Sequence, residues 1–205
     1  MEDVLDVYAL PYDRLYPVVC LDEKLVTLHG DVVPPLPVSP GHGERVDYTY
    51  KREETANLFV VVEPLAGWRQ VTVTARRTAR DYAEQLRWLA DVRYPQAHTI
   101  RLIQDNLNTH TLASLYRRYP PAEARRVAQR FEIHPTPKHG SWLDMAEIEI
   151  GVFTRGCLSR RVDSHHTLCR RVAALQSERN AHRATITWRG FVYHALSSPK
   201  VSSLL

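Results

Sequence analysis

The stretch that decides the fold is VVCLDE at residues 18–23, where four apolar residues run directly into two acids. A short continuous apolar run is typical of a buried strand in the middle of a sheet. Asp22 ends that run, at a place where a charge is costly unless something compensates it. Because an Asp at a strand end also caps turns, Asp22 taken alone is open to either interpretation. Glu23 points to the other face of the strand, where we expect it to be solvated or paired.

The same pattern returns in RLIQDN at residues 101–106. The run 99–104 is a second predicted buried strand, and Asp105 follows it directly. Asp105 and the Asn residues after it would also suit an Asx turn before a helix. In open sheets, however, functional sites gather at the carboxyl ends of strands. We therefore expect Asp22 and Asp105, on two such strands, to meet at one edge of the sheet.

The third motif, WLDMAE, opens a helix predicted over residues 142–158 with Ser141 as its N-cap. Asp144 has a structural explanation, as the third residue of a capping box. Glu147 lies at the rim of the helix's apolar face and Glu149 nearer its middle, so the helical wheel alone does not choose between them. A rim position suits a carboxylate that reaches a metal, whereas an ionised mid-face Glu is costly to bury.

Acids that converge from three motifs repel one another, and a hard divalent cation bound by carboxylate oxygens relieves that repulsion. Two such cations can activate a nucleophile and stabilise a leaving oxygen in phosphoryl transfer. The three motifs therefore predict a metal-dependent site for phosphoryl-transfer chemistry. His110 and His139 lie close in sequence to the acids and are the two of the ten histidines to watch.

The element order predicts an α/β fold with a mixed sheet flanked by helices. Early strands joined by short turns suggest an antiparallel meander, and later strand–helix–strand units suggest parallel additions. Thr78 and Asp81 resemble a capping box. The predicted strands cover 18–21, 25–29, 46–50, 56–63, 68–74, 99–104 and 131–134; a loop covers 31–43, a hairpin connection 64–67, and helices 78–92, 110–119, 121–129, 142–158 and 163–197.

The 205 residues divide into an N-terminal segment (1–16), a catalytic domain (17–160) and a basic helical tail packed on it (161–205). The net charge of +4 is compatible with a polyanionic partner and equally with a solvated surface. Three cysteines without a C-x-x-C pair indicate a reducing, cytosolic chain. No signal peptide or membrane-spanning apolar stretch is recognisable.

Basic residues gather around and after the third motif, and beside a metal site they would suit contacts with nucleic-acid phosphates. The same run is equally compatible with a solvated helical face. Trp142 and Trp188 are predicted to be core residues. The basic residues in question are Lys138, His139, Arg155, Arg160, Arg161, Arg170, Arg171, Arg179, Arg183 and Arg189.

Three stretches together resemble a known family: CLDEK at 20–24, QDNLNTH at 104–110 and HGSWLDMAE at 139–147. In this order they are similar to the catalytic domain of the IS630 branch of the IS630/Tc1/mariner DDE transposases, over residues 15–195. The resemblance implies a ribonuclease-H-like, mixed five-stranded sheet. It also implies a catalytic, metal-binding triad of Asp22, Asp105 and Glu147 that holds two Mg²⁺ or Mn²⁺ ions.

The implied reactions are metal-dependent cleavage of double-stranded DNA at transposon ends and strand transfer into target DNA, usually at a TA dinucleotide. The implied partners are that DNA and either a second copy of the chain or a helix-turn-helix-bearing part of the transposase. The implied location is the bacterial cytoplasm, on the nucleoid. No membrane partner is expected.

Three departures from the family pattern stand out. Asp144 replaces the usual Asn of the third motif. The 41 residues between Asp105 and Glu147 are also more than the spacing typical of the eukaryotic Tc1 relatives. The helix-turn-helix region is absent before Val18, so we expect a split reading frame or a truncated copy. The alternative function is then a non-catalytic remnant that binds DNA or oligomerises as a regulator. A nuclease for RNA–DNA hybrids or junctions fits the motifs less well.

Overall fold

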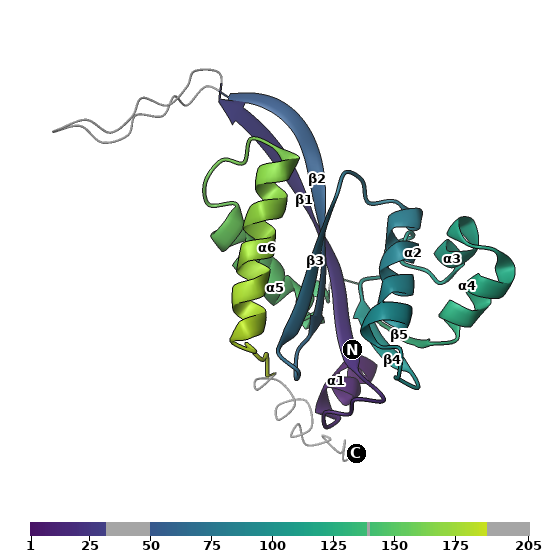
Figure 1. Cartoon of the computed structure of the whole chain (residues 1–205). Coiled ribbons are helices and arrows are strands. Elements are labelled where there is room, and N and C mark those ends of the chain that lie inside the picture. Colours follow the sequence, from purple (N-terminus) through teal and green to yellow (C-terminus); the bar gives the residue numbers. More distant parts are fainter. Residues whose placement is uncertain (32–49, 139, 188–205) are drawn as a thin grey trace, which may run out of the picture.

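One five-stranded mixed sheet organises the protein (Figure 1). The computed structural model describes residues 1–31, 50–138 and 140–187. The strands lie in the order β3-β2-β1-β4-β5, with β1, β2 and β3 antiparallel and β1, β4 and β5 parallel. The predicted mixed five-stranded sheet is therefore confirmed. The strands are β1 Val18–Asp31, β2 Tyr50–Glu63, β3 Trp68–Thr74, β4 Ile100–Gln104 and β5 Phe131–Pro135.

Helices cover both faces of the sheet (Figure 1). One face carries α2, α3 and α4, and the other carries α5 and α6, while α1 packs near the start of β1. None of the helices in the described ranges is both long and apolar enough to cross a membrane. The helices are α1 Glu2–Ala9, α2 Ala79–Trp88, α3 Ala113–Arg118, α4 Pro121–Ala128, α5 Ala146–Cys157 and α6 His165–Ala181; a π-helical turn spans Leu89–Arg93 and a 3₁₀ turn Ser141–Leu143.

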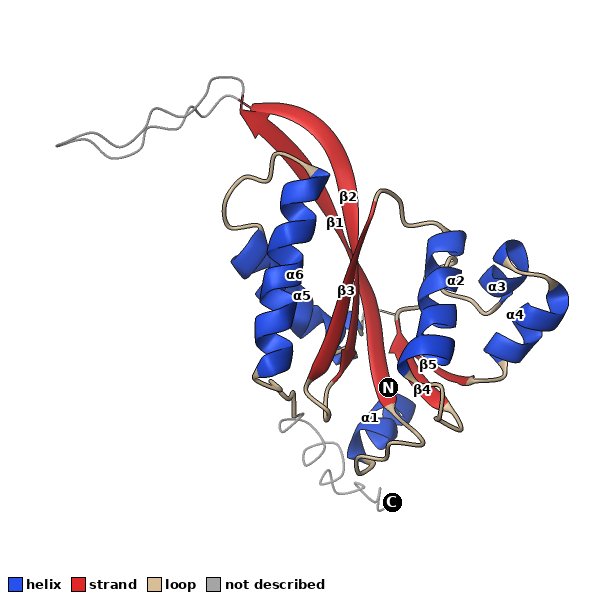
Figure 2. Cartoon of the chain, in the orientation of Figure 1, coloured by secondary structure: helices blue, strands red, loops and turns tan. Residues whose placement is uncertain are grey.

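The alternation of side chains along β1 explains why the sheet lies between two helical layers (Figure 2). Val19 and Leu21 join the core beneath α2, α3 and α4. Val26 and Leu28 point the other way, into the core beneath α5 and α6. Cys20 lies on that second face as well, in a separate cluster with α1 and the start of α5. A central strand of this kind reads as a continuous apolar run because both of its faces are buried.

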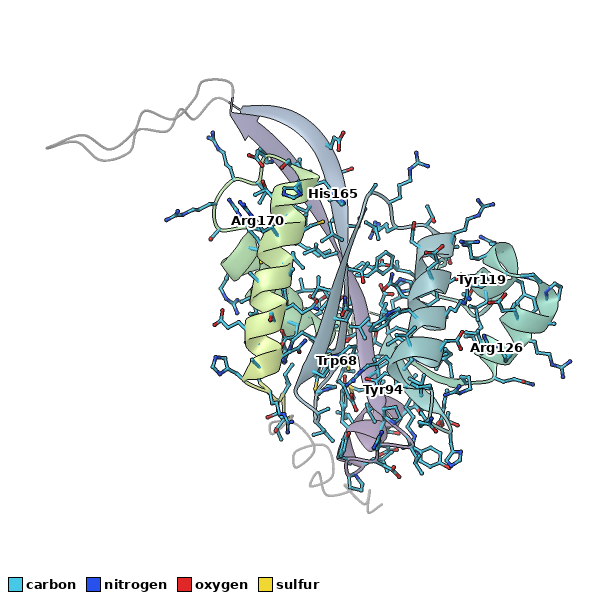
Figure 3. The ribbon with its side chains drawn as sticks, in the orientation of Figure 1. Trp68, Tyr94, Tyr119, Arg126, His165 and Arg170 are labelled. Carbon is cyan, nitrogen blue, oxygen red and sulfur yellow. The ribbon has the colours of Figure 1, made fainter. Side chains whose placement is uncertain are left out.

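An aromatic cluster anchors the end of α2 on the edge strand. Trp68 of β3 stacks on Trp88 with ring centroids 6.1 Å apart, and Tyr94 meets Trp68 edge-on at the same distance (Figure 3). Arg93 lies over the Trp68 ring at 4.0 Å, which adds a cation–π contact. At its other end α2 begins with the predicted capping box of Thr78 and Asp81, which is confirmed.

Two predicted strands, 18–21 and 25–29, are one strand. β1 continues through its acids because their backbones still pair with β2, Asp22 with Val60 and Glu23 with Phe59. Backbone pairing does not depend on the side chain, so a charged residue need not end a strand. The predicted loop 31–43 and the first four residues of the predicted strand 46–50 lie outside the described residues, apart from Asp31.

The C-terminal region also differs from prediction. α6 ends at Ala181, and residues 182–187 follow without helix, so the helix predicted over 163–197 is too long in this part; residues 188–197 lie outside the described chain. Trp142 is 46% exposed, so its assignment to the core is wrong. α6 packs on β3 and α5. The division into 1–16, 17–160 and 161–205 stays a prediction.

The hairpin connection 64–67 is confirmed and depends on a glycine. Gly67 has φ +62°, and a Cβ there would lie 2.4 Å from the carbonyl oxygen of Arg183. We expect Gly67→Ala to lower the free energy of unfolding by about 2 kcal/mol or more, measured by urea denaturation. Gly151→Ala is the matched control, because a Cβ there meets the far end of the Arg155 side chain at 3.4 Å. That helical change should leave stability unchanged or raise it by up to about 1 kcal/mol; equal losses in both variants would contradict the assignment.

Candidate active site

The parallel pairing of β1 with β4 places two of the predicted acids next to each other. Cys20 is level with Ile103, and Leu21 is level with Gln104. Asp22 and Asp105 each come one residue later, so the two carboxylates leave the same end of this strand pair. The register thus places the backbones of Asp22 and Asp105 side by side at one end of the β1–β4 pairing, and their role as site residues stays a prediction.

Glu147 reaches the same place from the first turn of α5. Cys20, Ile103 and Ala146 pack in one buried cluster, and each precedes one of the three acids by one or two residues. The packing of that cluster therefore brings the three chain segments together beneath the acids. Glu147 is exposed on the helix surface, and its negative charge acts on Asp22 together with that of Asp105.

Asp22 experiences this crowding most strongly. Burial is the largest influence, and the charges of Glu147, Asp105 and Glu23 add to it. The backbone N–H of Glu23 donates a hydrogen bond to Asp22 Oδ1 at 2.7 Å, which opposes the rise. Together these effects raise the pKa of Asp22 to about 7. No basic residue in the described part of the chain is among these main influences on Asp22.

His110 bridges two acids, Glu23 of β1 and Asp105 after β4. Its Nε2 lies 2.8 Å from Glu23 Oε1, and its Nδ1 contacts Asp105 Oδ1. Burial disfavours the imidazolium, but the hydrogen bonds and charges of Asp105 and Glu23 outweigh it and raise the pKa of His110 to about 9. The ring is therefore positively charged at neutral pH and fixes the Asp105 carboxylate. Glu23 is paired, as predicted.

Tyr82 and Gln104 hold His110 in place, and the sequence analysis missed both. The Tyr82 ring stacks on the imidazole with centroids 4.8 Å apart. Its hydroxyl donates to Gln104 Oε1, and Gln104 Nε2 donates to the His110 carbonyl at 2.7 Å. A polar Gln at the last position of a buried strand was the available signal. His139, the other histidine singled out, lies outside the described residues.

The start of the third-motif helix differs from prediction. Ser141 opens a 3₁₀ turn, and α5 begins only at Ala146, so the capping box with Ser141 as N-cap is wrong. Asp144 is 1% exposed, and its Oδ1 accepts a hydrogen bond from the Ala146 N–H at 2.9 Å. Burial, reinforced by the charges of Asp22, Asp105 and Glu147, raises the Asp144 pKa well above its usual range. Tyr8 of α1 fastens this turn by donating to the Leu143 carbonyl at 2.7 Å.

The structure separates Glu147 from Glu149, which the helical wheel did not. Glu149 is fully buried and ion-paired to two arginines, Arg69 at 3.2 Å and Arg179 at 2.6 Å. Arg69, also fully buried, further donates to the carbonyls of Gly67 and Arg179, both at 2.9 Å. Glu149 is therefore a structural residue that ties α5 to β3 and α6, and Glu147 is left to face the other acids.

The three acids suit a hard divalent cation in their donor chemistry. All three offer carboxylate oxygens, which Mg²⁺ and Mn²⁺ prefer. Burial is the main cause of the raised pKa of Asp22, and the negative charges of Glu147, Asp105 and Glu23, which a cation would offset, add to it. As placed, no three Asp, Glu, His or Cys side chains in the described ranges form a ready ligand set. Asp105 is held by His110 instead. The three acids fit a divalent cation by their chemical type and their location. To bind it together, their side chains must turn toward one point.

These features define a ribonuclease-H-like α/β domain with acids gathered at one end of the central strands. The chain belongs to the DDE superfamily endonucleases, whose family model matches residues 17–169. None of the curated proteins matches the sequence.

Solved structures of the Mos1 mariner transposase share the fold. The Mos1 strand transfer complex aligns with a TM-score of 0.58 at 15% identity, covering 89% of this chain and 56% of that one. The Mos1 paired-end complex with Mn aligns with a TM-score of 0.56 at 15% identity, covering 89% and 57%. The Mos1 paired-end complex with Mg gives 0.53 at 16% identity, with the same coverage. This chain thus spans less than three fifths of the length of those proteins.

Neutralising the two glutamates of α5 should affect the stability of the protein to different extents. Glu149→Gln leaves the buried Arg69 without its counter-charge, so we expect the free energy of unfolding to fall by about 3–5 kcal/mol. Glu147→Gln is the matched control: at an exposed position it should change stability by less than about 0.5 kcal/mol. Urea denaturation followed by tryptophan fluorescence measures both. Equal stability of the two variants would refute the structural assignment of Glu149.

The stability of the metal-free protein should depend on pH through Asp22. Its pKa is higher folded than unfolded, so between pH 4 and 7 the folded state binds more protons. Stability should therefore fall as pH rises through this window, by up to about 4 kcal/mol. Asp22→Asn should reduce the slope of this stretch, to which the raised pKa of the buried Asp144 also contributes, and should stabilise the protein at pH 8, whereas the exposed control Asp6→Asn should keep the slope. His110 titrates near pH 9 and acts above this window. A profile unchanged by Asp22→Asn would contradict the assignment.

Proposed function

We propose that this chain is the catalytic domain of a DDE transposase of the IS630 branch of the IS630/Tc1/mariner group. It cleaves double-stranded DNA at transposon ends and transfers the cut strand into target DNA. The observation that carries the proposal is the convergence of Asp22, Asp105 and Glu147 at one end of the sheet, in a chain of the DDE endonuclease family. The sequence motifs at residues 20–24, 104–110 and 139–147 favour the IS630 branch.

In this proposal Asp22, Asp105 and Glu147 hold two Mg²⁺ or Mn²⁺ ions. Bound ions of this kind supply activation of the attacking oxygen and stabilisation of the leaving oxygen at phosphorus. Asp22 lies in β1 and Asp105 directly follows β4, so the sheet positions the backbones of two of the three acids before DNA arrives. His110 orients the Asp105 carboxylate, and the bond between them must loosen for Asp105 to turn toward an ion. Asp144 is buried beside these acids, and burial raises its pKa well above its usual range.

The proposed partners are transposon-end and target DNA. The Mos1 structures that share the fold are described as paired-end and strand transfer complexes, two of them with Mn or Mg. By analogy we propose that this domain works on DNA as a homodimer or together with a helix-turn-helix-bearing part of the transposase. Its proposed place is the bacterial nucleoid. The proposals of two ions, a dimer and this location rest on this analogy and on the three sequence motifs.

Nicking of supercoiled plasmid DNA tests the proposal. We expect cleavage that needs Mg²⁺ or Mn²⁺ and that falls by at least about 1,000-fold in Asp105→Asn. Asp6→Asn, at an exposed position on α1, is the control and should cut like the parent protein. Equal cutting by the parent and Asp105→Asn would end the catalytic assignment. A parent protein that binds DNA but never cuts it would favour the regulatory remnant.

A further inference from the structure

An open groove of about 930 Å³ lies between the start of α2 and α3, outside the acid cluster. Seven of its eight lining residues are polar or charged, four of them are arginines, and none is aromatic. A pocket for a small ligand is instead mostly apolar and closes around its occupant. The composition of this groove therefore suits an extended anion that stays partly in solvent.

The acids in this groove are already engaged. Glu84 is paired with Arg118 at 2.8 Å. Asp81 accepts hydrogen bonds from the Thr78 N–H and hydroxyl, both at 2.7 Å, in the cap of α2. Three further arginines on the lining, Arg76, Arg80 and Arg117, are exposed and form no ion pair with any acid in the described ranges. Their positive charge is available to a partner.

Both walls of the groove also build the acid site. On the α2 wall, Tyr82 lies two residues after Arg80 and stacks on His110, which holds Asp105. The α3 wall follows the loop that starts at Asp105, and Ser114 of α3 donates to the Thr109 carbonyl of that loop at 2.7 Å. A polymer in the groove is therefore held by the same two elements that fix Asp105.

We propose that this arginine groove, lined by Arg76, Arg80 and Arg117, binds the sugar-phosphate backbone of duplex DNA beside the bond that is cut. The inference rests on the proposed function, since it names where the substrate of that site is held. Guanidinium groups suit phosphate oxygens geometrically and electrostatically. Single-stranded DNA is ordinarily bound by stacking its bases on aromatic rings. A lining without aromatic residues favours the duplex.

The test is duplex DNA binding without divalent metal, measured by fluorescence anisotropy with a labelled 30-base-pair probe in EDTA over a series of NaCl concentrations. The groove variant is Arg80→Gln/Arg117→Gln, one change on each wall. Loss of two phosphate contacts should reduce the slope of log K against log[NaCl] by about 1.8 and weaken binding on the order of 30-fold at 0.15 M.

The matched control is Arg14→Gln/Arg125→Gln, which removes the same charge at two exposed positions away from the groove. Arg125 adjoins Arg126, which Figure 3 labels on α4. For this control variant, the slope of log K against log[NaCl] should stay within about 0.5 of the parent value, because a distant charge adds little to binding. Equal losses in the two double variants, or an unchanged slope in the groove variant, would overturn the proposal. Circular dichroism confirms that each variant is folded.

Two further arms separate this inference from the proposed function. If the Asp105→Asn variant no longer nicks DNA yet binds the duplex like the parent, while the groove variant loses binding, the proposed function and the arginine groove both stand. If the parent never nicks but the groove variant still loses duplex binding, the groove stands and the nuclease assignment falls. If single-stranded DNA or an RNA–DNA hybrid binds more tightly than the duplex with the same arginine dependence, the duplex assignment is overturned.

Discussion

The parallel pairing of β1 with β4 is the constraint on which the site depends. Its register sets Leu21 level with Gln104, so the backbones of Asp22 and Asp105, each one residue further along, are neighbours. The cost is a concentration of negative charge in partly buried surroundings, visible in the pKa of Asp22 near 7. Such an arrangement lowers the stability of the metal-free protein, as sites that must bind a charged group often do.

The surrounding structure limits that cost by giving each nearby acid a different environment. Glu23 and Asp105 share the positive charge of His110. Asp144 is fully buried, and burial raises its pKa well above its usual range, which favours its neutral form. Glu149 is neutralised by Arg69 and Arg179 on the far side of α5. Asp22 and Glu147 form no ion pair with a basic residue in the described ranges, and that is where a cation would be most strongly attracted.

The sequence predicts the sheet well because apolar runs between turn residues reflect burial directly. The placement of Asp22 beside Asp105 follows from the same pattern, but the end of β1 does not, because its backbone pairing continues past the acids. The choice between Glu147 and Glu149 was beyond it, because the deciding partner, Arg69, lies 80 residues away in the chain. The start of α5 was misplaced for a similar reason: Tyr8, which fastens the Leu143 turn, comes from the other end of the protein. His110 was noticed for its nearness to Asp105, but its second bond, to Glu23, is again long-range.

The most direct test of the central claim is anomalous diffraction from crystals grown with Mn²⁺. We expect manganese peaks whose ligands include oxygens of Asp22, Asp105 and Glu147, with no peak in crystals of Asp105→Asn. Manganese bound elsewhere on the chain, or ligated by Glu149 or Asp144 in place of Glu147, would contradict it.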